Sequence, residues 1–397
     1  MARRTDRVAF VIVLGLIGAL LVGCAKRQNE LVVGEYGSLT GTTATFGIST
    51  KNGIELYIDN VNSAGGIAGT PIRVIVEDDQ SKPEEAATAV NKLVDQDGVI
   101  AVLGEVASSR SMAAAPICQQ AGVPMITPSS TNPKVTEIGD YIFRVCYIDP
   151  FQGQMIAKSA KETLGFTRAA VLRDTKNDYS VGLANFFSQA FQALGGTIVA
   201  DEAYGEGDQD FKAQLTVIKS KRPQVLVVPG YYTEVGLIAR QARELGLDVP
   251  LLGGDGWDSD RLIEIGQTAL EGSCFINHYF PGDPNPAVQR FVESYRARYN
   301  ATPDALAALA YDAAGVLVSA LNSIKQESPS SFQALLGPRN EAQKAARAML
   351  RDKIAATKDF PGVAGRITLD ASRNAVKPAI LVGIKNGKYE LIAAVEP

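Results

Sequence analysis

The chain has 397 residues, of which 46% are hydrophobic and 21% charged, the composition of an ordinary globular protein. This length suggests two or three domains. The formal net charge of −4 gives no indication of a nucleic-acid partner. The single histidine, His278, excludes sites that need several imidazoles, such as His-rich zinc centres, and disfavours hydrolytic triads.

Residues 1–23 predict an export signal that is not part of the fold. Three arginines lie among the first seven residues, and the apolar run Val8–Val22 is 15 residues long, shorter than the ~20 residues of a membrane span. Gly23 followed by Cys24 is typical of a bacterial lipoprotein, in which the thiol of Cys24 is lipidated and the chain is cut before it. The alternatives are an ordinary signal peptide with an incidental cysteine, or an uncleaved anchor helix. Residues 24–30 would form a tether.

Three further cysteines follow Cys24, at positions 118, 146 and 274. An odd number in an oxidising compartment leaves at least one thiol unpaired. None shows C-x-x-C spacing, so no metal site is expected, and Cys274 is favoured as a small buried residue. A bridge between Cys118 and Cys146 stays open, because sequence alone does not give the geometry that a disulfide needs.

From Leu31 onward, apolar runs typical of strands alternate with amphipathic stretches typical of helices. One such stretch places Ile54, Tyr57, Ile58 and Val61 on a single helical face. The runs are continuous rather than alternating, which indicates sheets covered by helices on both faces. The predicted strands are 31–34, 71–76, 99–103 and 123–127 in the first half, and 169–172, 197–199 and 225–228 in the second half.

The predicted fold is α/β, with two Rossmann-like lobes that have parallel sheets and are joined by a hinge of three crossovers. The crossovers are expected near residues 146–150, 275–281 and 361–366. Lobe 1 would contain 31–147 plus 276–361, and lobe 2 would contain 148–275 plus 362–397. Near the end, Asn386-Gly387 between two apolar runs predicts a β-hairpin.

The sequence contains none of the motifs that mark common catalytic or nucleotide sites. There is no G-x-G-x-x-G, G-x-x-x-x-G-K-[ST], H-E-x-x-H or G-x-S-x-G. Carboxylate pairs such as Asp78-Asp79 and Asp258/Asp260 are common in surface loops. We therefore expect a protein that is not an enzyme and that has no cofactor and no metal.

Hydroxyl side chains follow two predicted strands at the point where each strand ends. Ser108 and Ser109 open a predicted helix after the strand that ends at Leu103, and Ser129 and Thr131 follow the strand that ends at Thr127. In open α/β sheets ligands bind beyond the carboxyl ends of strands. A helix N-terminus flanked by hydroxyls suits a carboxylate, although helix capping alone explains the same residues.

Several segments in order along the chain resemble the leucine/isoleucine/valine-binding family, type I periplasmic binding proteins that serve ABC importers. The similarity covers nearly the whole chain after the tether. The segments that carry it are 63–69 (SAGGIAG), Asp78-Asp79, Leu103-Gly104 through Ser108-Ser109, 122–131 (GVPMITPSST) and 236–243 (GLIARQAR).

The resemblance implies a site for an amino-acid zwitterion. Ser108, with its neighbour Ser109, and Thr131 would hold the α-carboxylate. The carbonyl of Ser129, the hydroxyl of Thr131 and the acidic side chain of Asp255 would hold the α-ammonium. This agrees with physical expectation, since charges removed from water must be well paired. Family members often have glutamate where this chain has Asp255, which is a shorter acid.

The resemblance also implies an aromatic enclosure. Tyr179 and Tyr231 from lobe 2 would close over the ligand, and Phe46 and Trp257 would line the pocket for its side chain. From the residues alone, Trp257 is either core or pocket wall, and Tyr231 and Tyr232 could equally pack on a sheet.

The expected function is therefore that of an extracytoplasmic solute-binding protein, periplasmic or at the cell surface, anchored at Cys24. It would act as a monomer, capture a branched-chain or aliphatic amino acid, and deliver it to ABC-type permease and ATPase subunits. The membrane would be contacted only through the lipid. The alternatives are an extracytoplasmic ligand sensor, and a binding protein for a small amide or an aromatic acid.

Overall fold

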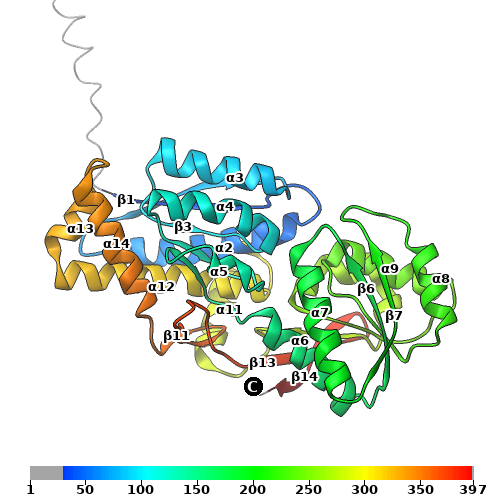
Figure 1. The fold of residues 1–397 in the computed structure, drawn as a ribbon. Coiled ribbons are helices and arrows are strands. Elements are labelled where there is room, and N and C mark those ends of the chain that lie inside the picture. The colour runs from blue at the N-terminus through cyan, green and yellow to red at the C-terminus, as the bar shows by residue number, and fades with distance from the viewer. Residues whose placement is uncertain (1–29, 396–397) are drawn as a thin grey trace, which may run out of the picture.

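The computed structural model describes residues 30–395, so the predicted signal peptide and the lipid attachment at Cys24 lie outside the described residues. Two α/β lobes lie side by side (Figure 1). One contains the blue, cyan and orange elements and the other contains the green ones, while the chain ends in the red hairpin of the second lobe. The predicted fold class is confirmed.

The sheet of the first lobe is wholly parallel, as predicted. Its strand order is β2-β1-β3-β4-β5, so β1 lies inside the sheet and pairs with both β2 and β3. The strands are β1 (Leu31–Gly37), β2 (Ile72–Asp78), β3 (Val102–Leu103), β4 (Met125–Thr127) and β5 (Ile142–Arg144).

Helices cover both faces of this sheet, and a small hairpin adjoins them. The helices are α2 (Ala44–Ser63), α3 (Pro83–Asn91), η1 (Lys92–Asp97), α4 (Ser108–Ala121), α5 (Lys134–Glu137), α11 (Pro286–Tyr299), α12 (Ala305–Glu327), α13 (Pro329–Leu335) and α14 (Glu341–Ala355), and the hairpin strands are β11 (Phe360–Gly362) and β12 (Gly365–Ile367).

The long helix α12 is the centre of the first lobe. By length and composition alone it could cross a membrane, the one such helix among residues 30–395, but most of its apolar window is buried in the protein. It packs closely on α2, where a Cβ on Gly53 would lie 2.2 Å from the carbonyl oxygen of Ala307. Only glycine permits this approach of the two backbones, so α12 is a core helix of the lobe.

The sheet of the second lobe has seven strands in the order β14-β13-β10-β9-β8-β6-β7. It departs from the parallel expectation at one edge, because β13 is antiparallel to both β10 and β14. The strands are β6 (Arg168–Asp174), β7 (Thr197–Tyr204), β8 (Val225–Val227), β9 (Leu251–Gly253), β10 (Cys274–Asn277), β13 (Ala379–Lys385) and β14 (Lys388–Val395).

The predicted hairpin near the C-terminus joins β13 to β14. Asn386 and Gly387 both have positive φ, 52° and 67°, the conformation that a two-residue type I′ turn requires. The helices of the second lobe are α6 (Asp149–Lys158), η2 (Ser159–Thr163), α7 (Asp178–Ala193), α8 (Lys212–Ser220), α9 (Tyr232–Glu244), η3 (Asp255–Trp257), α10 (Asp260–Gly266) and η4 (Gln267–Leu270).

The chain crosses between the lobes three times, and the third crossing lies later than residues 361–366. Ile367, Leu369 and Ala375 pack in the core of the first lobe, and the chain joins the second sheet only at β13. Asp312 of α12 holds the turn between β11 and β12 to the first lobe. Its carboxylate accepts hydrogen bonds from Val363 N (2.7 Å) and Ala364 N (2.9 Å). The second crossing follows β10, whose residues 276–277 belong to the second sheet.

The three cysteines of the described chain are unpaired, so the bridge between Cys118 and Cys146 does not form. Cys118 of α4 packs with α3 on one face of the first sheet, whereas Cys146 packs at the hinge with Tyr279 and α12. Burial raises the pKa of all three thiols to about 12. Since the thiolate is the reactive form, these cysteines are chemically inert in the folded protein.

We therefore expect the Cys24→Ser protein to release almost no thiol signal with Ellman's reagent under native conditions. In guanidinium chloride it should release three equivalents, one for each buried cysteine. Fast reaction of the native protein, or fewer than three equivalents after unfolding, would contradict this arrangement.

Candidate functional site

A cavity lies between the lobes, where the carboxyl ends of strands from both sheets meet. It is lined by Phe46, Val106, Ser129 and Leu306 of the first lobe and by Tyr179, Tyr231, Asp255 and Gly256 of the second lobe. Its volume is about 10 Å³, roughly the space for one water molecule. A larger ligand therefore requires the lobes to part and the lining side chains to turn.

The lobes are in contact around this cavity, so the structure is a closed form. The hydroxyl of Ser109 lies 2.9 Å from a carboxylate oxygen of Asp178 and accepts a hydrogen bond from Asp178 N at 3.0 Å. Asn132 Nδ2 donates to the carbonyl of Asp178 at 2.9 Å, and the hydroxyls of Thr45 and Ser259 lie 3.0 Å apart. Ser109 thus joins the lobes and does not line the cavity, which corrects its expected role.

Hydrogen-bond donors gather at the start of α4. This helix begins at Ser108 without a side-chain cap, so the N–H groups of its first turn have no intrahelical partner. Ser108 Oγ accepts from Asn132 N at 3.2 Å, which leaves the hydroxyl proton of Ser108 free to be donated. Thr131 is buried, and its hydroxyl lies close enough to Asp149 to lower the pKa of that carboxyl group. This group of donors suits an anion.

Asp255 begins the short helix η3 at the end of β9. One of its oxygens, Oδ2, lies 3.0 Å from His278 Nε2, while Oδ1 is buried without a partner among the described residues. Burial lowers the pKa of His278 to about 4, so this imidazole is neutral near pH 7. The ring of Tyr147 stacks on it, with centroids 3.6 Å apart. His278 therefore orients Asp255 without neutralising its charge.

A second acid, Asp149, was not identified from the sequence. It is the first residue of α6, and its carboxyl group lies beside the hydroxyl of Thr131. Burial raises the pKa of Asp149 to about 8; the Thr131 hydroxyl opposes this increase, and the negative charge of Asp255 adds to it. Arg144 lies close enough to oppose this shift, but its guanidinium donates to the carbonyls of Ser130 (2.5 Å) and Asn132 (2.7 Å) instead. The two acids together favour a bound cation.

Aromatic rings close the apolar side of the cavity. Tyr179 and Tyr231 stack with centroids 5.4 Å apart, and Phe46 meets Tyr231 edge to face at the same distance. The ring of Tyr232 contacts Phe46 from the other side, at 5.0 Å. Gly256 N donates to the Tyr179 hydroxyl at 3.2 Å, which ties this enclosure to the loop that carries Asp255.

Trp257 does not line the cavity, contrary to expectation. It is fully buried, its indole N–H donates to the carbonyl of Val228 at 2.9 Å, and its ring packs near Phe275 with centroids 6.0 Å apart. Gly253 lies directly against the indole, where a Cβ would be 2.1 Å from Trp257 Cε2. The tryptophan is therefore a core residue beneath the loop.

Five of the residues expected at the site line the cavity together: Phe46, Ser129, Tyr179, Tyr231 and Asp255. Ser108, at the start of α4, and Thr131, in the loop after β4, are buried but do not belong to the cavity wall.

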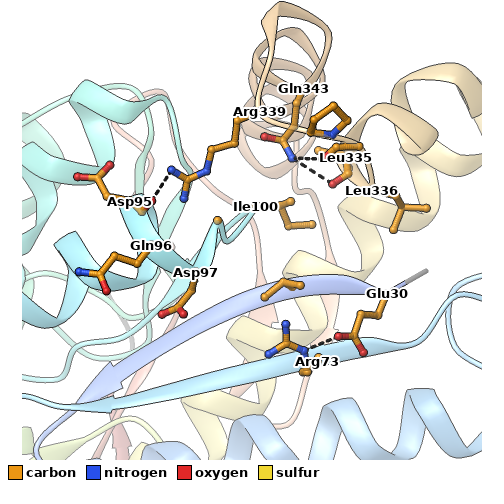
Figure 2. A pocket seen from close by; sticks show the side chains of 14 residues that line it. Glu30, Arg73, Asp95, Gln96, Asp97, Ile100, Leu335, Leu336, Arg339 and Gln343 are labelled. Atoms are coloured by element: carbon orange, nitrogen blue, oxygen red, sulfur yellow. Dashed lines mark hydrogen bonds and ion pairs between the residues drawn. The ribbon is translucent and has the colours of Figure 1, made fainter. Parts of the chain in front are cut away.

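A larger pocket of about 540 Å³ lies on the outer edge of the first lobe (Figure 2). It is at the amino ends of the strands, since Glu30 precedes β1 and Ile100 precedes β3. Its arginines are already paired: Arg73 with Glu30 at 2.5 Å, and Arg339 with the carbonyl of Asp95 at 2.8 Å (Figure 2). In α/β sheets the ligand side is the opposite, carboxyl edge.

Comparison with known proteins gives consistent matches. A family model described as periplasmic binding protein matches residues 30–388. The leucine-, isoleucine-, valine-, threonine- and alanine-binding protein of Pseudomonas aeruginosa is 32% identical over 296 residues, 74% of this chain and 78% of that protein.

Two solved structures are similar over almost their whole length. A leucine-binding protein of Thermotoga maritima has 38% identity and a TM-score of 0.84, covering 92% of this chain and 99% of that one. A branched-chain amino acid transporter substrate-binding protein of Streptococcus pneumoniae, solved with isoleucine, has 34% identity and a TM-score of 0.83, covering 93% and 100%.

These matches extend over both lobes, the hinge and the cavity between them. They confirm the resemblance drawn from the sequence motifs. The chain belongs to the leucine/isoleucine/valine-binding family of periplasmic binding proteins, which are extracytoplasmic solute-binding proteins and not enzymes.

Proposed function

We propose that this protein captures a branched-chain or other aliphatic amino acid as a zwitterion between its lobes and delivers it to an ABC importer. The observation that carries the proposal is the placement of buried polar groups of opposite kinds in and beside the cavity. Donors gather at the start of α4, outside the cavity wall, and Asp255 in the wall keeps Oδ1 without a partner among the described residues, with Asp149 buried close by. The relatives named above bind branched-chain amino acids according to their descriptions.

The anionic end of the ligand would lie at the uncapped start of α4. The free N–H groups of the first turn and the partial positive charge of the helix favour a carboxylate there. The hydroxyls of Ser108 and Thr131 would add two donors. Each of these groups is buried, so leaving them unpaired in the closed form has a desolvation cost that a bound carboxylate removes.

The ammonium end would lie at Asp255, with the carbonyl of Ser129 and the hydroxyl of Thr131 as further acceptors from the first lobe. Asp149 has a raised pKa of about 8, so it would add negative charge at the same place only when a bound ammonium lowers that pKa. A shorter acid than glutamate serves here because His278 fixes its orientation through Oδ2, which leaves Oδ1 for the ligand. A charge-assisted hydrogen bond of this kind is stronger than a neutral one.

The apolar enclosure would receive the side chain of the amino acid. Phe46, Tyr231, Val106 and Leu306 present carbon surface to the cavity. An aromatic acid or a simple amide would satisfy this surface but would bring no positive charge to Asp255. That carboxylate would then be buried without a countercharge, which is costly, so the amino acid is favoured.

We further propose that Cys24 is lipidated and anchors the protein outside the cytoplasm, as a monomer that meets permease and ATPase subunits of an importer. The apolar run and the cysteine at its end support the anchor. A sensor that presents the closed form to a receptor is the alternative. Transporter genes beside this one would favour import, and their absence would favour sensing.

We expect leucine, isoleucine or valine to raise the melting temperature of the purified protein. A ligand at a hundred times its Kd adds about 2.7 kcal/mol to the free energy of unfolding. Differential scanning fluorimetry against the twenty amino acids, benzoate, acetamide and glucose tests this. Stabilisation by benzoate, acetamide or glucose, with none by any amino acid, would disprove the zwitterion site.

Asp255→Asn should weaken leucine binding about ten- to a hundredfold, because a hydrogen bond to a charged group contributes ~1.5–3 kcal/mol. The Kd for 4-methylpentanoate, which is leucine without its ammonium group, should change much less. Isothermal titration calorimetry measures both values.

The matched control is Asp248→Asn, the same change of charge at an exposed position of the same lobe. It should leave both affinities unaltered. Equal loss of leucine and 4-methylpentanoate affinity in Asp255→Asn would show that Asp255 supports the loop and does not bind the ammonium.

Replacing Cys24 with alanine should abolish incorporation of radioactive palmitate and release the protein from the membrane fraction. Cys274→Ala, a change at a buried thiol, is the control and should be labelled like the wild type. Equal labelling of the Cys24→Ala protein would reject the lipoprotein assignment.

A further inference from the structure

A second pocket between the lobes shares no lining residue with the cavity described above. It has a volume of about 400 Å³, within the usual range for small-molecule sites. The start of α2, with Thr45, Ile48 and Ser49, forms one wall, and the second-lobe segment 258–261 forms another. The pocket therefore belongs to both lobes.

Three carboxylates line this pocket without a basic partner. No lysine or arginine among residues 30–395 forms a salt bridge with Asp258, Asp260 or Asp304. Arg261 also lines the pocket, but its guanidinium is paired with Glu264. Both hydrogen bonds to Asp258, from Asn277 Nδ2 (2.9 Å) and Ala305 N (2.7 Å), reach Oδ2. No described residue donates a hydrogen bond to Oδ1 of Asp258, so this oxygen can accept hydrogen bonds from a ligand.

Hydrogen bonds, but no salt bridge, reach this cluster from the described residues: Asp304 accepts from Ser49 Oγ at 2.6 Å and from Ala307 N at 2.8 Å. Burial raises the pKa of Asp304 to about 7, and the charge of Asp258 adds to the increase. Burial likewise raises the pKa of Asp258 to about 6. A bound cation would relieve the repulsion between these carboxylates.

Aromatic and apolar side chains form the rest of the wall, among them Tyr279, Phe280, Tyr295 and Tyr389. Tyr279 is 4% exposed, and its hydroxyl has no hydrogen-bond partner in the described part of the chain. An unpartnered buried hydroxyl in the wall of a pocket indicates that a ligand or water completes its hydrogen bonding.

The chemistry of the wall distinguishes between kinds of cation. Within residues 30–395 there is no group of three or more His, Cys, Asp or Glu side chains placed to hold a metal ion. Aromatic rings beside carboxylates are instead suited to organic ammonium groups, through cation–π attraction and charge pairing together.

We propose that this pocket binds a small organic ammonium ion with an apolar body. Its charged end pairs with Asp258, Asp260 and Asp304, and its body lies against the aromatic wall. This is a second ligand site of the protein, chemically distinct from the zwitterion site because it contains no uncapped helix start or other cluster of anion donors.

An ammonium ion bound here would also favour closure. Two hydrogen bonds in the walls of this pocket join the lobes. Ala305 N donates to Asp258 at 2.7 Å, and the hydroxyls of Thr45 and Ser259 lie 3.0 Å apart. A ligand that touches both lobes binds the closed form better than the open one. By linkage it raises the affinity of any ligand that also requires closure, and this part of the inference rests on the proposed function.

The test uses benzylammonium as the probe and benzyl alcohol as its neutral match, titrated by calorimetry in phosphate buffer that contains no other amine. We expect benzylammonium to bind the wild type and Asp255→Asn with the same Kd, and benzyl alcohol to bind much more weakly. Independence from Asp255 separates this pocket from the zwitterion site. Equal binding of the two probes would overturn the proposal.

Two variants locate the site. Asp304→Asn keeps a good helix N-cap and so should remain folded, yet should weaken benzylammonium binding about tenfold. Asp260→Asn, at the exposed rim, should weaken it about threefold, and Asp248→Asn should have no effect. An unchanged Kd in both pocket variants would also overturn the proposal.

Closure is tested separately by titrating leucine in saturating benzylammonium, where its affinity should rise about fivefold. No change would reject the coupling between the two sites. If no amino acid binds, the proposed function fails, while the binding of benzylammonium and its loss in Asp304→Asn still decide the second site.

Discussion

Negative charge buried where two lobes meet is the constraint on which the rest of this structure depends. Asp255 Oδ2 lies 3.0 Å from Nε2 of the neutral His278, and Oδ1 has no partner among the described residues. Asp149 is buried close to Asp255, beside the hydroxyl of Thr131. In an open form water would solvate both acids. In the closed form that water is largely removed, because the cavity has room for about one molecule. A positive group between the lobes therefore makes closure more favourable, because it pairs with Asp255 and removes the need to protonate Asp149.

The architecture supplies the precision that this constraint requires. Asp255 is fixed by the end of β9 and by His278, which follows β10 at the second crossing. Asp149 begins α6 immediately after the first crossing. The charged groups thus lie next to the hinge, where closure changes their positions least, whereas the aromatic rings of Tyr231 and Phe46 come from opposite lobes and meet only when the lobes close.

Local patterns predicted the fold well because their causes are local. Asn386-Gly387 specifies its hairpin through the positive φ of two adjacent residues, and strand runs specify buried sheets through burial on both faces. The mistakes concern contacts between distant residues. Trp257 is a core residue because its indole reaches the carbonyl of Val228, and Ser109 joins the lobes because Asp178 lies opposite it. No neighbouring sequence encodes either partner.

Asp149 shows a different limit, since its sequence context is that of any acidic residue at a helix start. What makes it part of the site is complete burial close to Asp255. The late third crossing has the same kind of cause, because the carboxylate of Asp312 holds Val363 and Ala364 to the first lobe. The pattern of apolar runs in the sequence does not reveal a hydrogen bond between residues that lie about 50 positions apart.

The three crossings also determine the order in which the chain can fold as it emerges. The strands from β6 to β10 are contiguous in sequence, so most of the second lobe can form early. The first lobe cannot, because α12 begins about 160 residues after β5 and covers a sheet that is otherwise complete. Until that helix is available, only α2 covers the face of the first sheet that carries Val33, Leu103 and Ile126, and part of this apolar face stays exposed to solvent. Exposed apolar surface of this kind promotes aggregation. The first lobe is therefore the part of the nascent chain that most needs protection by chaperones.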